Sequence, residues 1–215
     1  PPVIVGGQVF VADEDAHAVC ALNAVDGNIQ WTYTTGGRVD SPPTFCNGRL
    51  LFCSRDGWVY CLRASDGELA WRFRAAPEDK RVVAYGQIES LWPVNGSVLV
   101  KDGVVYFTAG RSTNLDGGIK VFALDLETGA ALHTKVLHTW SRTRQDAEGK
   151  PFVPAYHMEG ALSDILVCEG DHIYLGQYKF DRSLNQQAVP YVMLGPNKKS
   201  GAMGQTELAE KPYVR

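Results

Sequence analysis

Ala21-Leu22-Asn23-Ala24-Val25-Asp26-Gly27-Asn28-Ile29-Gln30-Trp31 is the first of three copies of one phrase in this chain. The second copy is Cys61-Leu62-Arg63-Ala64-Ser65-Asp66-Gly67-Glu68-Leu69-Ala70-Trp71, and the third is Ala123-Leu124-Asp125-Leu126-Glu127-Thr128-Gly129-Ala130-Ala131-Leu132-His133. The first two copies lie 40 residues apart. A period of roughly 40 to 45 residues is the spacing of four-stranded propeller blades. The repeat therefore predicts a β-propeller.

On either side of each copy, segments rich in β-forming residues are separated by short predicted turns. The turns that precede the copies, and the turn after the third, are Gly6-Gly7, Asn47-Gly48, Asp102-Gly103 and Glu169-Gly170. Asn-Gly and Asp-Gly pairs between β-rich runs indicate hairpins, because both central residues of a type I′ turn need positive φ. The sequence thus predicts an all-β fold with antiparallel strands.

The expected architecture is a partial β-propeller of four-stranded antiparallel blades, about three and a half in number. The predicted blades are residues 1–37, 40–76, 87–137 and 158–195, and residues 196–215 are expected to form a C-terminal tail or interface strap. So few blades do not close a ring. We expect the rest of the propeller ring to come from additional residues of the same protein, from a second subunit or from an irregular closing strand.

Composition excludes several classes of partner. The chain has 215 residues, 45% of them hydrophobic, so it can bury a substantial core. A net charge of −3 gives no electrostatic reason to expect binding to nucleic acid or to an anionic membrane. No window approaches the ~20 apolar residues that span a bilayer. The chain begins at Pro1 rather than Met, which suggests a processed or excised piece.

The five cysteines show no Cys-x-x-Cys spacing and no adjacent pair. This argues against a zinc site or a redox dithiol. Cys46, Cys53, Cys61 and Cys168 stand in apolar, strand-like runs, where a free thiol behaves as a small hydrophobe. A single disulfide remains an alternative.

Distances between the turns grow along the chain, from 41 to 55 to 67 residues between Gly7, Gly48, Gly103 and Gly170. The added residues fall in three predicted loops at 75–89, 111–118 and 137–160. Loops of this length between rigid strands commonly carry function. We expect the long loops of blades two and three to gather on one face and to form the site.

The phrase resembles the quinoprotein-type β-propeller repeat, Ala-x-Asp-x-x-Thr-Gly-x-x-x-Trp. The resemblance covers about residues 1–180 and implies a tryptophan-docking motif, in which the Trp packs between adjacent blades. Gly27, Gly67 and Gly129 match the repeat in all three copies, and Trp31 and Trp71 match in two. The departures are Asn23 and Arg63 for Asp, Asp26 and Asp66 for Thr, and His133 for Trp.

Residues 89–118 look like those of a subgroup of secreted bacterial propellers that resemble outer-membrane-assembly proteins. This implies an extracytoplasmic or periplasmic location. Quinone-dependent dehydrogenases of the same fold carry an adjacent Cys-Cys pair, a calcium site and a channel of eight blades. The chain has no such pair and too few blades. No cofactor is therefore expected, with pyrroloquinoline quinone (PQQ) and calcium as the alternative.

Four residues are candidates for ligand binding: Trp92, Arg111, Asp116 and Trp140. Trp92 and Trp140 lie in or beside long loops, where an indole can contact a ligand or pack the loop. Arg111 can bind a carboxylate or phosphate through its guanidinium fork. An Arg111–Asp116 pair that only pins the loop fits the sequence equally well.

A metal site is the second possibility, with Asp116, Glu159, Asp164 and Asp181 as oxygen ligands. No nucleophile elbow, P-loop or paired-carboxylate motif is present in the sequence. We therefore expect a non-catalytic binding or scaffolding propeller that presents its loops to a protein or a small ligand. The alternative is a fragment of a quinone-dependent oxidoreductase or a metal-assisted enzyme on the same face, and self-association through open blade edges is a third reading.

Overall fold

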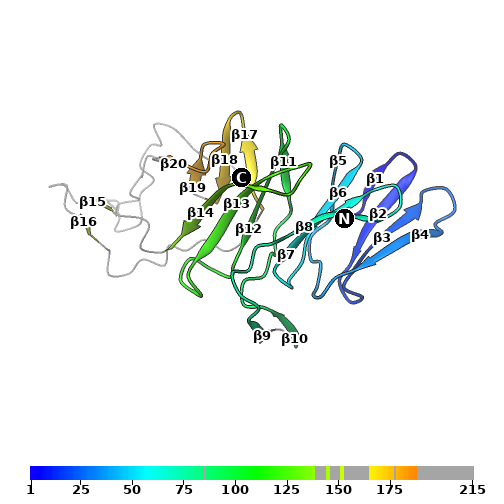
Figure 1. Ribbon diagram of the computed structural model, residues 1–215, viewed down its shortest axis with the longest axis horizontal. Helices are drawn as coiled ribbons and strands as arrows, with labels where there is room; N and C mark the ends of the chain where they lie inside the picture. The colour runs from blue at the N-terminus through cyan, green and yellow to red at the C-terminus, as the bar shows by residue number, and fades with distance from the viewer. Residues whose placement is uncertain (85, 139–143, 146–150, 153–164, 177, 188–215) are drawn as a thin grey trace, which may run out of the picture.

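The computed structural model describes residues 1–84, 86–138, 144–145, 151–152, 165–176 and 178–187. Its regular elements are all β-strands, and four antiparallel sheets of four strands stand side by side as propeller blades (Figure 1). The prediction of a partial, all-β propeller is confirmed. The tail predicted at 196–215 lies outside the described residues.

Each blade is built from consecutive strands. The first two blades contain β1 (Val3–Val5), β2 (Gln8–Asp13), β3 (Ala18–Asn23) and β4 (Ile29–Thr34), then β5 (Thr44–Cys46), β6 (Arg49–Cys53), β7 (Trp58–Arg63) and β8 (Leu69–Arg74). The other two contain β11 (Leu99–Lys101), β12 (Val104–Ala109), β13 (Ile119–Asp125) and β14 (Ala131–Leu137), then β17 (Val167–Glu169), β18 (His172–Leu175), β19 (Tyr178–Phe180) and β20 (Gln186–Gln187). In addition, two short hairpins pair β9 (Arg81–Ala84) with β10 (Gln87–Ser90), and β15 (Arg144–Gln145) with β16 (Pro151–Phe152).

The order of strands gives the blades two distinct ends. We call one end the turn face, since it carries the short turns that join the first strand of a blade to the second and the third to the fourth. The opposite end is the loop face, and it carries the connections between second and third strands and the links from blade to blade. The loops predicted at 75–89 and 111–118 both belong to the loop face, as expected.

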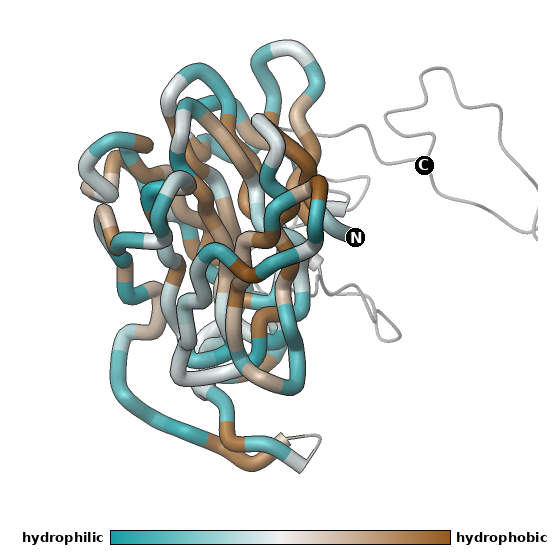
Figure 2. Tube along the Cα trace, turned by 90° about the vertical axis from the view of Figure 1, so that its right-hand side faces the viewer, coloured by the Kyte–Doolittle hydropathy of each residue, from teal (hydrophilic) through white to brown (hydrophobic). Residues whose placement is uncertain are grey.

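The segment 75–89 differs from the prediction of a plain loop. It contains β9 and most of β10, and this hairpin projects from the loop face (Figure 1). Figure 2 shows a hydrophilic link that leads into a hydrophobic stretch of the hairpin. Val82 and Val83 are β-branched residues that favour a strand, and Gly86 at φ +76° lies at the turn. The range predicted for the third blade, 87–137, therefore also includes β10, which pairs outside that blade.

The core lies between blades. One cluster joins the first two blades through residues such as Phe10, Leu50 and Phe52, and a second joins blades two and three around Val59 and Phe107. A third cluster joins blades three and four. Fully burying one such side chain contributes about 1.5–3 kcal/mol. Each blade is thus held mainly by its neighbours, since a single sheet has no interior of its own.

The repeated phrase forms the joint between blades. The indole N–H of Trp31 donates to the carbonyl oxygen of Ala64 at 3.0 Å, and that of Trp71 donates to Leu126 at 2.9 Å. The Trp31 ring lies directly over Gly67, where an added Cβ would come within 2.6 Å of the indole. The Trp71 ring covers Gly129 in the same way. Glycine is therefore required at these two positions, because the tryptophan ring occupies the space that a side chain would fill.

The third joint uses a different residue. His133 occupies the position of Trp31 and Trp71 in the sheet register, opposite Ala123. The hydroxyl of Tyr106, on the neighbouring strand opposite the same Ala123, donates instead to the carbonyl oxygen of Arg182 at 3.0 Å. Tyr106 is completely buried. A tyrosine of the second strand thus replaces the hydrogen bond that the missing tryptophan would make.

Candidate functional site: the loop face

Five alternating charges form a ladder across the loop face. Arg38 contacts Glu14 at 2.5 Å and Asp40 at 3.1 Å, and Arg55 pairs with Asp40 and, at 2.6 Å, with Glu89. Glu14 lies in the β2–β3 loop, Arg38 and Asp40 in the link between the first two blades, and Arg55 in the β6–β7 turn. Glu89 belongs to β10. The ladder therefore ties the projecting hairpin to the first two blades.

Burial strengthens the hairpin end of this ladder. The Glu89 side chain is only 4% exposed. Burial works to lower the pKa of Arg55, but its hydrogen bonds to Glu89 and Asp40 outweigh that effect and raise the pKa. Arg55 therefore stays charged at every physiological pH. Its backbone carbonyl also accepts the N–H of Ser90 at 2.8 Å, so main chain and side chain fix the hairpin together.

Three of the four predicted ligand residues lie together on the loop face. The indole N–H of Trp92 donates to the carbonyl oxygen of Asp116 at 2.6 Å, and the Asp116 carboxylate accepts from Arg111 at 2.6 and 3.1 Å. Trp92 is buried. This contact corresponds to the loop-pinning alternative, because both polar groups are occupied within the β12–β13 loop. A role for these residues in ligand binding stays a prediction, and Trp140 lies outside the described residues.

The predicted metal ligands are divided between two places. Asp116 pairs with Arg111 on the loop face, whereas Asp181 stands in the β19–β20 turn and accepts the backbone N–H groups of Ser183 and Asn185 at 2.9 Å. The hydrogen bond from the Asn185 side chain, together with these backbone bonds, lowers the pKa of Asp181. Glu159 and Asp164 lie outside the described residues.

A quinone–calcium site needs clustered carboxylates, and the described residues do not provide one. In that part of the chain no three His, Cys, Asp or Glu side chains come close enough together to hold a metal ion. The sequence also has no adjacent cysteines. The described residues therefore do not fit a quinone–calcium pair.

A cavity that the sequence did not reveal opens where the second blade meets the loop face. It has a volume of about 240 Å³, and its walls include Trp58, Arg72 and Arg74. The Arg72 guanidinium lies over the Trp58 ring, 4.5 Å from its centre. The available signal was the alternation Trp71-Arg72-Phe73-Arg74, which places two arginines on one face of an outer strand.

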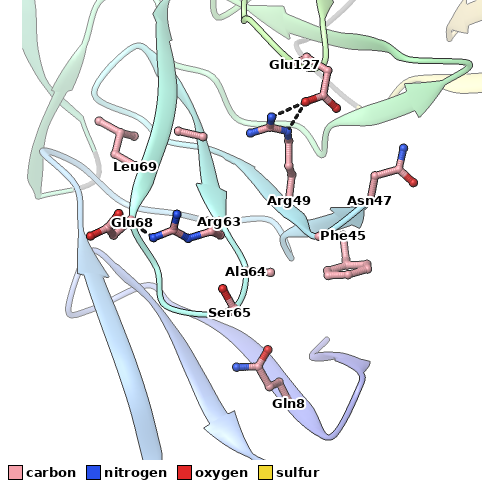
Figure 3. Close-up of a pocket in the computed structure, with 12 residues that line it drawn as sticks. Gln8, Phe45, Asn47, Arg49, Arg63, Ala64, Ser65, Glu68, Leu69 and Glu127 are labelled. Atoms are coloured by element: carbon pink, nitrogen blue, oxygen red, sulfur yellow. Dashed lines mark hydrogen bonds and ion pairs between the residues drawn. The ribbon is translucent and has the colours of Figure 1, made fainter.

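A larger groove of about 660 Å³ lies on the turn face (Figure 3). Its arginines are already paired: Arg49 with Glu127, and Arg63 with Glu68 at 2.7 Å and with Asp66. Figure 3 shows Arg49 directed toward Glu127 and Arg63 toward Glu68, with a dashed contact in each pair. Each of these two arginines already has a carboxylate partner, so neither guanidinium is free to bind a charged ligand in the groove.

Comparison with known proteins assigns the family. A family model described as "Outer membrane protein assembly factor BamB" matches residues 1–172. This span takes in the three copies of the repeated phrase and the loop-face ladder. The chain belongs to this family. The resemblance to outer-membrane-assembly-type propellers in the sequence is thereby confirmed.

Two curated relatives carry the same name. The outer membrane protein assembly factor BamB of Yersinia pestis is 36% identical over 66 residues, and that of Moranella endobia is 34% identical over 67. Each alignment covers 31% of this chain, and the chain spans only 16% and 17% of the two relatives. The activities and partners of the whole relatives are thus not established for this chain.

Solved structures support the fold. A quinohemoprotein alcohol dehydrogenase from Pseudomonas putida HK5 is similar with a TM-score of 0.52 and 23% identity, over 63% of this chain and 20% of that one. At this identity the similarity shows the blade architecture alone. Within the described part of this BamB-family chain, no helix is long and apolar enough to span a bilayer.

Proposed function

We propose that this chain is a non-catalytic, extracytoplasmic scaffold that holds a partner protein on its loop face. The family description and the names of the curated relatives support a role in outer membrane protein assembly. The observation that carries the proposal is the β9–β10 hairpin. It projects from the loop face (Figure 1), and the ion pair between the partly buried Arg55 and the buried Glu89 anchors its base.

The exposed side chains of the hairpin suit a protein partner. Val83 is 73% exposed and Ile88 is 60% exposed, and the two residues face each other across the hairpin. Apolar side chains displayed on a fixed projection are typical of interaction sites rather than of a catalytic cleft. A rigid base also reduces the entropy that the hairpin loses on binding.

The test is site-specific photo-crosslinking in cells of the native host, with the full-length protein. A photoreactive residue replaces Val83 in one variant and Val25 in the control, because Val25 is also exposed but lies on the turn face. We expect one discrete protein adduct from position 83, identified by mass spectrometry as an outer membrane assembly component. An adduct from position 25 alone, or none from either position, contradicts the proposal.

A further inference from the structure

The cavity beside the hairpin has the make-up of an anion-binding pocket. Trp58 and Tyr60 of β7 stand opposite Arg74 and Arg72 of β8 in the sheet register, so all four side chains share one face of the second blade. The cavity lies between this face and the links at the loop face, near Gly36. Arg72 stacks on Trp58, which leaves the edge of its planar fork available for hydrogen bonds.

The carboxylates around the cavity already have partners. One oxygen of Asp56 accepts the Tyr60 hydroxyl at 2.6 Å and the N–H of Gly36 at 2.9 Å, and the other accepts the N–H of Trp58 at 3.0 Å. Burial and the nearby Asp56 raise the pKa of Tyr60, so the phenol keeps the proton that it donates.

The two remaining carboxylates lie in the link to the hairpin. Glu78 pairs with Lys80 at 2.7 Å, and Asp79 pairs with Arg81 at 3.3 Å. Among the described residues, neither Arg72 nor Arg74 has a carboxylate within ion-pair distance. The pocket therefore contains two guanidinium groups that form no ion pair with the described residues, and the Asp56 carboxylate in the same lining is held by neutral donors.

The pocket continues onto the exposed side of the hairpin. Arg81 lines the cavity, and strand alternation places Val83 on the same side of β9. Ile88 stands opposite Val83. One surface thus leads from the arginine pair to an aliphatic pair, and it differs from the turn-face groove, where Arg49 and Arg63 are neutralised by their own carboxylates.

We propose that Arg72 and Arg74 bind a carboxylate of the partner protein, from an acidic side chain next to aliphatic residues that lie on Val83 and Ile88. This inference rests on the proposed function and specifies the chemistry of the partner. A carboxylate accepts two parallel hydrogen bonds from a guanidinium, and the stacking on Trp58 holds Arg72 in place before the partner arrives.

The probe is the synthetic extended peptide acetyl-Glu-Ser-Glu-Ser-Ile-Ser-Val-amide, in which alternate residues present two carboxylates and then two aliphatic side chains. Its control peptide has Gln in place of both Glu residues. Binding is followed by two-dimensional NMR of the labelled chain through the indole N–H signal of Trp58. We expect saturable binding of the acidic peptide that weakens as NaCl is raised from low to moderate concentration. The Gln peptide should bind at least about tenfold more weakly.

The variants are Arg72→Gln and Arg74→Gln, with Arg63→Gln in the turn-face groove as the matched control. We expect a loss of about tenfold or more in peptide affinity from each of the first two and no change from Arg63→Gln. Unchanged far-UV circular dichroism checks folding. Equal binding of the Gln peptide, or a normal affinity in Arg72→Gln, overturns the proposal. Tighter binding of a peptide with phosphoserine in place of Glu overturns the assignment of a carboxylate.

Crosslinking separates this inference from the proposed function. If the Val83 adduct forms equally in the double variant Arg72→Gln/Arg74→Gln, the scaffold function stands and the carboxylate pocket does not. If the acidic peptide binds but position 83 gives no adduct in cells, the pocket stands and the scaffold function does not. An adduct that disappears in the double variant supports both.

Discussion

At the scale of single residues, the joints between blades depend on where an aromatic ring meets a glycine. Gly67 and Gly27 have nearly the same backbone, with φ of +75° and +73°. They differ only in what covers them. The indole of Trp31 lies on Gly67, whereas no atom lies within 4 Å of a Cβ at Gly27. Comparing the two glycines therefore distinguishes two reasons for glycine: the positive φ, which both positions have, and the room for a tryptophan ring, which only Gly67 must provide.

Gly67→Ala should therefore destabilise the chain more than Gly27→Ala. Both place an alanine in the left-handed region, which costs about 1–2 kcal/mol. Gly67→Ala also drives a methyl group into a packed ring, which adds about 1–3 kcal/mol. Urea unfolding followed by circular dichroism measures the difference. Equal losses in the two variants would show that the indole does not require the glycine.

The replacement of tryptophan by Tyr106 at the third joint is also testable. Tyr106→Phe leaves the partly buried carbonyl of Arg182 without its donor, and we expect a loss of about 1 kcal/mol in unfolding free energy. The control is Tyr33→Phe, because the Tyr33 hydroxyl makes no hydrogen bond to the described residues, and that change should be nearly neutral. A loss of the same size in both variants would assign the effect to packing instead.

At the scale of elements, the β9–β10 hairpin depends on its anchor more than on its own pairing. It has two short strands, and such a hairpin is marginal by itself in water. The buried Glu89 carboxylate and the Arg55 guanidinium fix its base, and Asp40 shares the same guanidinium. The position of the hairpin is thus decided by residues distant from it in sequence.

Glu89→Gln should loosen the hairpin while the blades stay folded. Removing the charge weakens the ion pair with Arg55, but Arg55 keeps Asp40 as a partner. We therefore expect the local stability of the hairpin to fall by about 1–3 kcal/mol. Amide hydrogen exchange of residues 81–90 should rise selectively. Glu78→Gln is the control, because its pair with Lys80 is exposed and contributes little. Unchanged exchange in Glu89→Gln would mean that main-chain bonds alone hold the hairpin.

At the scale of the whole molecule, burial between the blades controls the chemistry of the thiols. Cys53 and Cys61 are buried, and Cys20, Cys46 and Cys168 are partly exposed. Burial raises the pKa of Cys61 to about 11 and raises that of Cys53 still further. The fold therefore favours the neutral thiols.

Iodoacetamide at pH 8 should label Cys20, Cys46 and Cys168 and spare Cys53 and Cys61 until urea is added. The thiolate is the reactive form, and burial both hides the two inner thiols and suppresses their ionisation. The folded pKa of Cys61 lies above the pKa of the unfolded chain. Burial of the neutral Cys61 thiol therefore contributes fully to folding stability at any pH below that unfolded pKa. This contribution is lost as the pH rises toward 11. Labelling of Cys61 in the native chain would contradict the packing between blades two and three.

The outer face of the first blade has no neighbour among the described residues. Ile4, Val9, Leu22 and Ile29 form one row across this face. In the matching row of the second blade, the central residues Leu50 and Leu62 are fully buried in the cluster shared with the first blade. Ile4 and Ile29 are 68% and 65% exposed. The same kind of surface is thus covered between the first and second blades but exposed on the outer side of the first blade.

We therefore expect the 215-residue chain to self-associate through this face at high concentration. Ile4→Lys/Ile29→Lys should return it to a monomer in light scattering, because buried lysines without partners oppose the contact. Val25→Lys, in a turn of the same blade, should leave association unchanged. A wild-type chain that stays monomeric would contradict the expectation.

The sequence by itself determined the repeat, the strand order and the docking glycines, because these depend on contacts that recur with a fixed period. It also named Trp92, Arg111 and Asp116 as candidate ligand residues; the structure places the three in one loop-face cluster, and their role in binding stays a prediction. The loop segment 75–89 was the clearest gap, since its β-rich residues formed a hairpin instead of a plain loop.

Only the tertiary structure decided what depends on neighbouring blades. The Arg55–Glu89 pair joins residues 34 positions apart, and the hydrogen bond from Tyr106 to Arg182 joins residues 76 positions apart. Neither follows from a local pattern, because one guanidinium or hydroxyl can serve many acceptors until packing selects one. For the same reason the Arg72–Trp58 pocket was visible only once β7 and β8 were paired. Local sequence determines the strands and turns of each blade, whereas the assembly of blades holds them together and determines which polar groups are left for a partner.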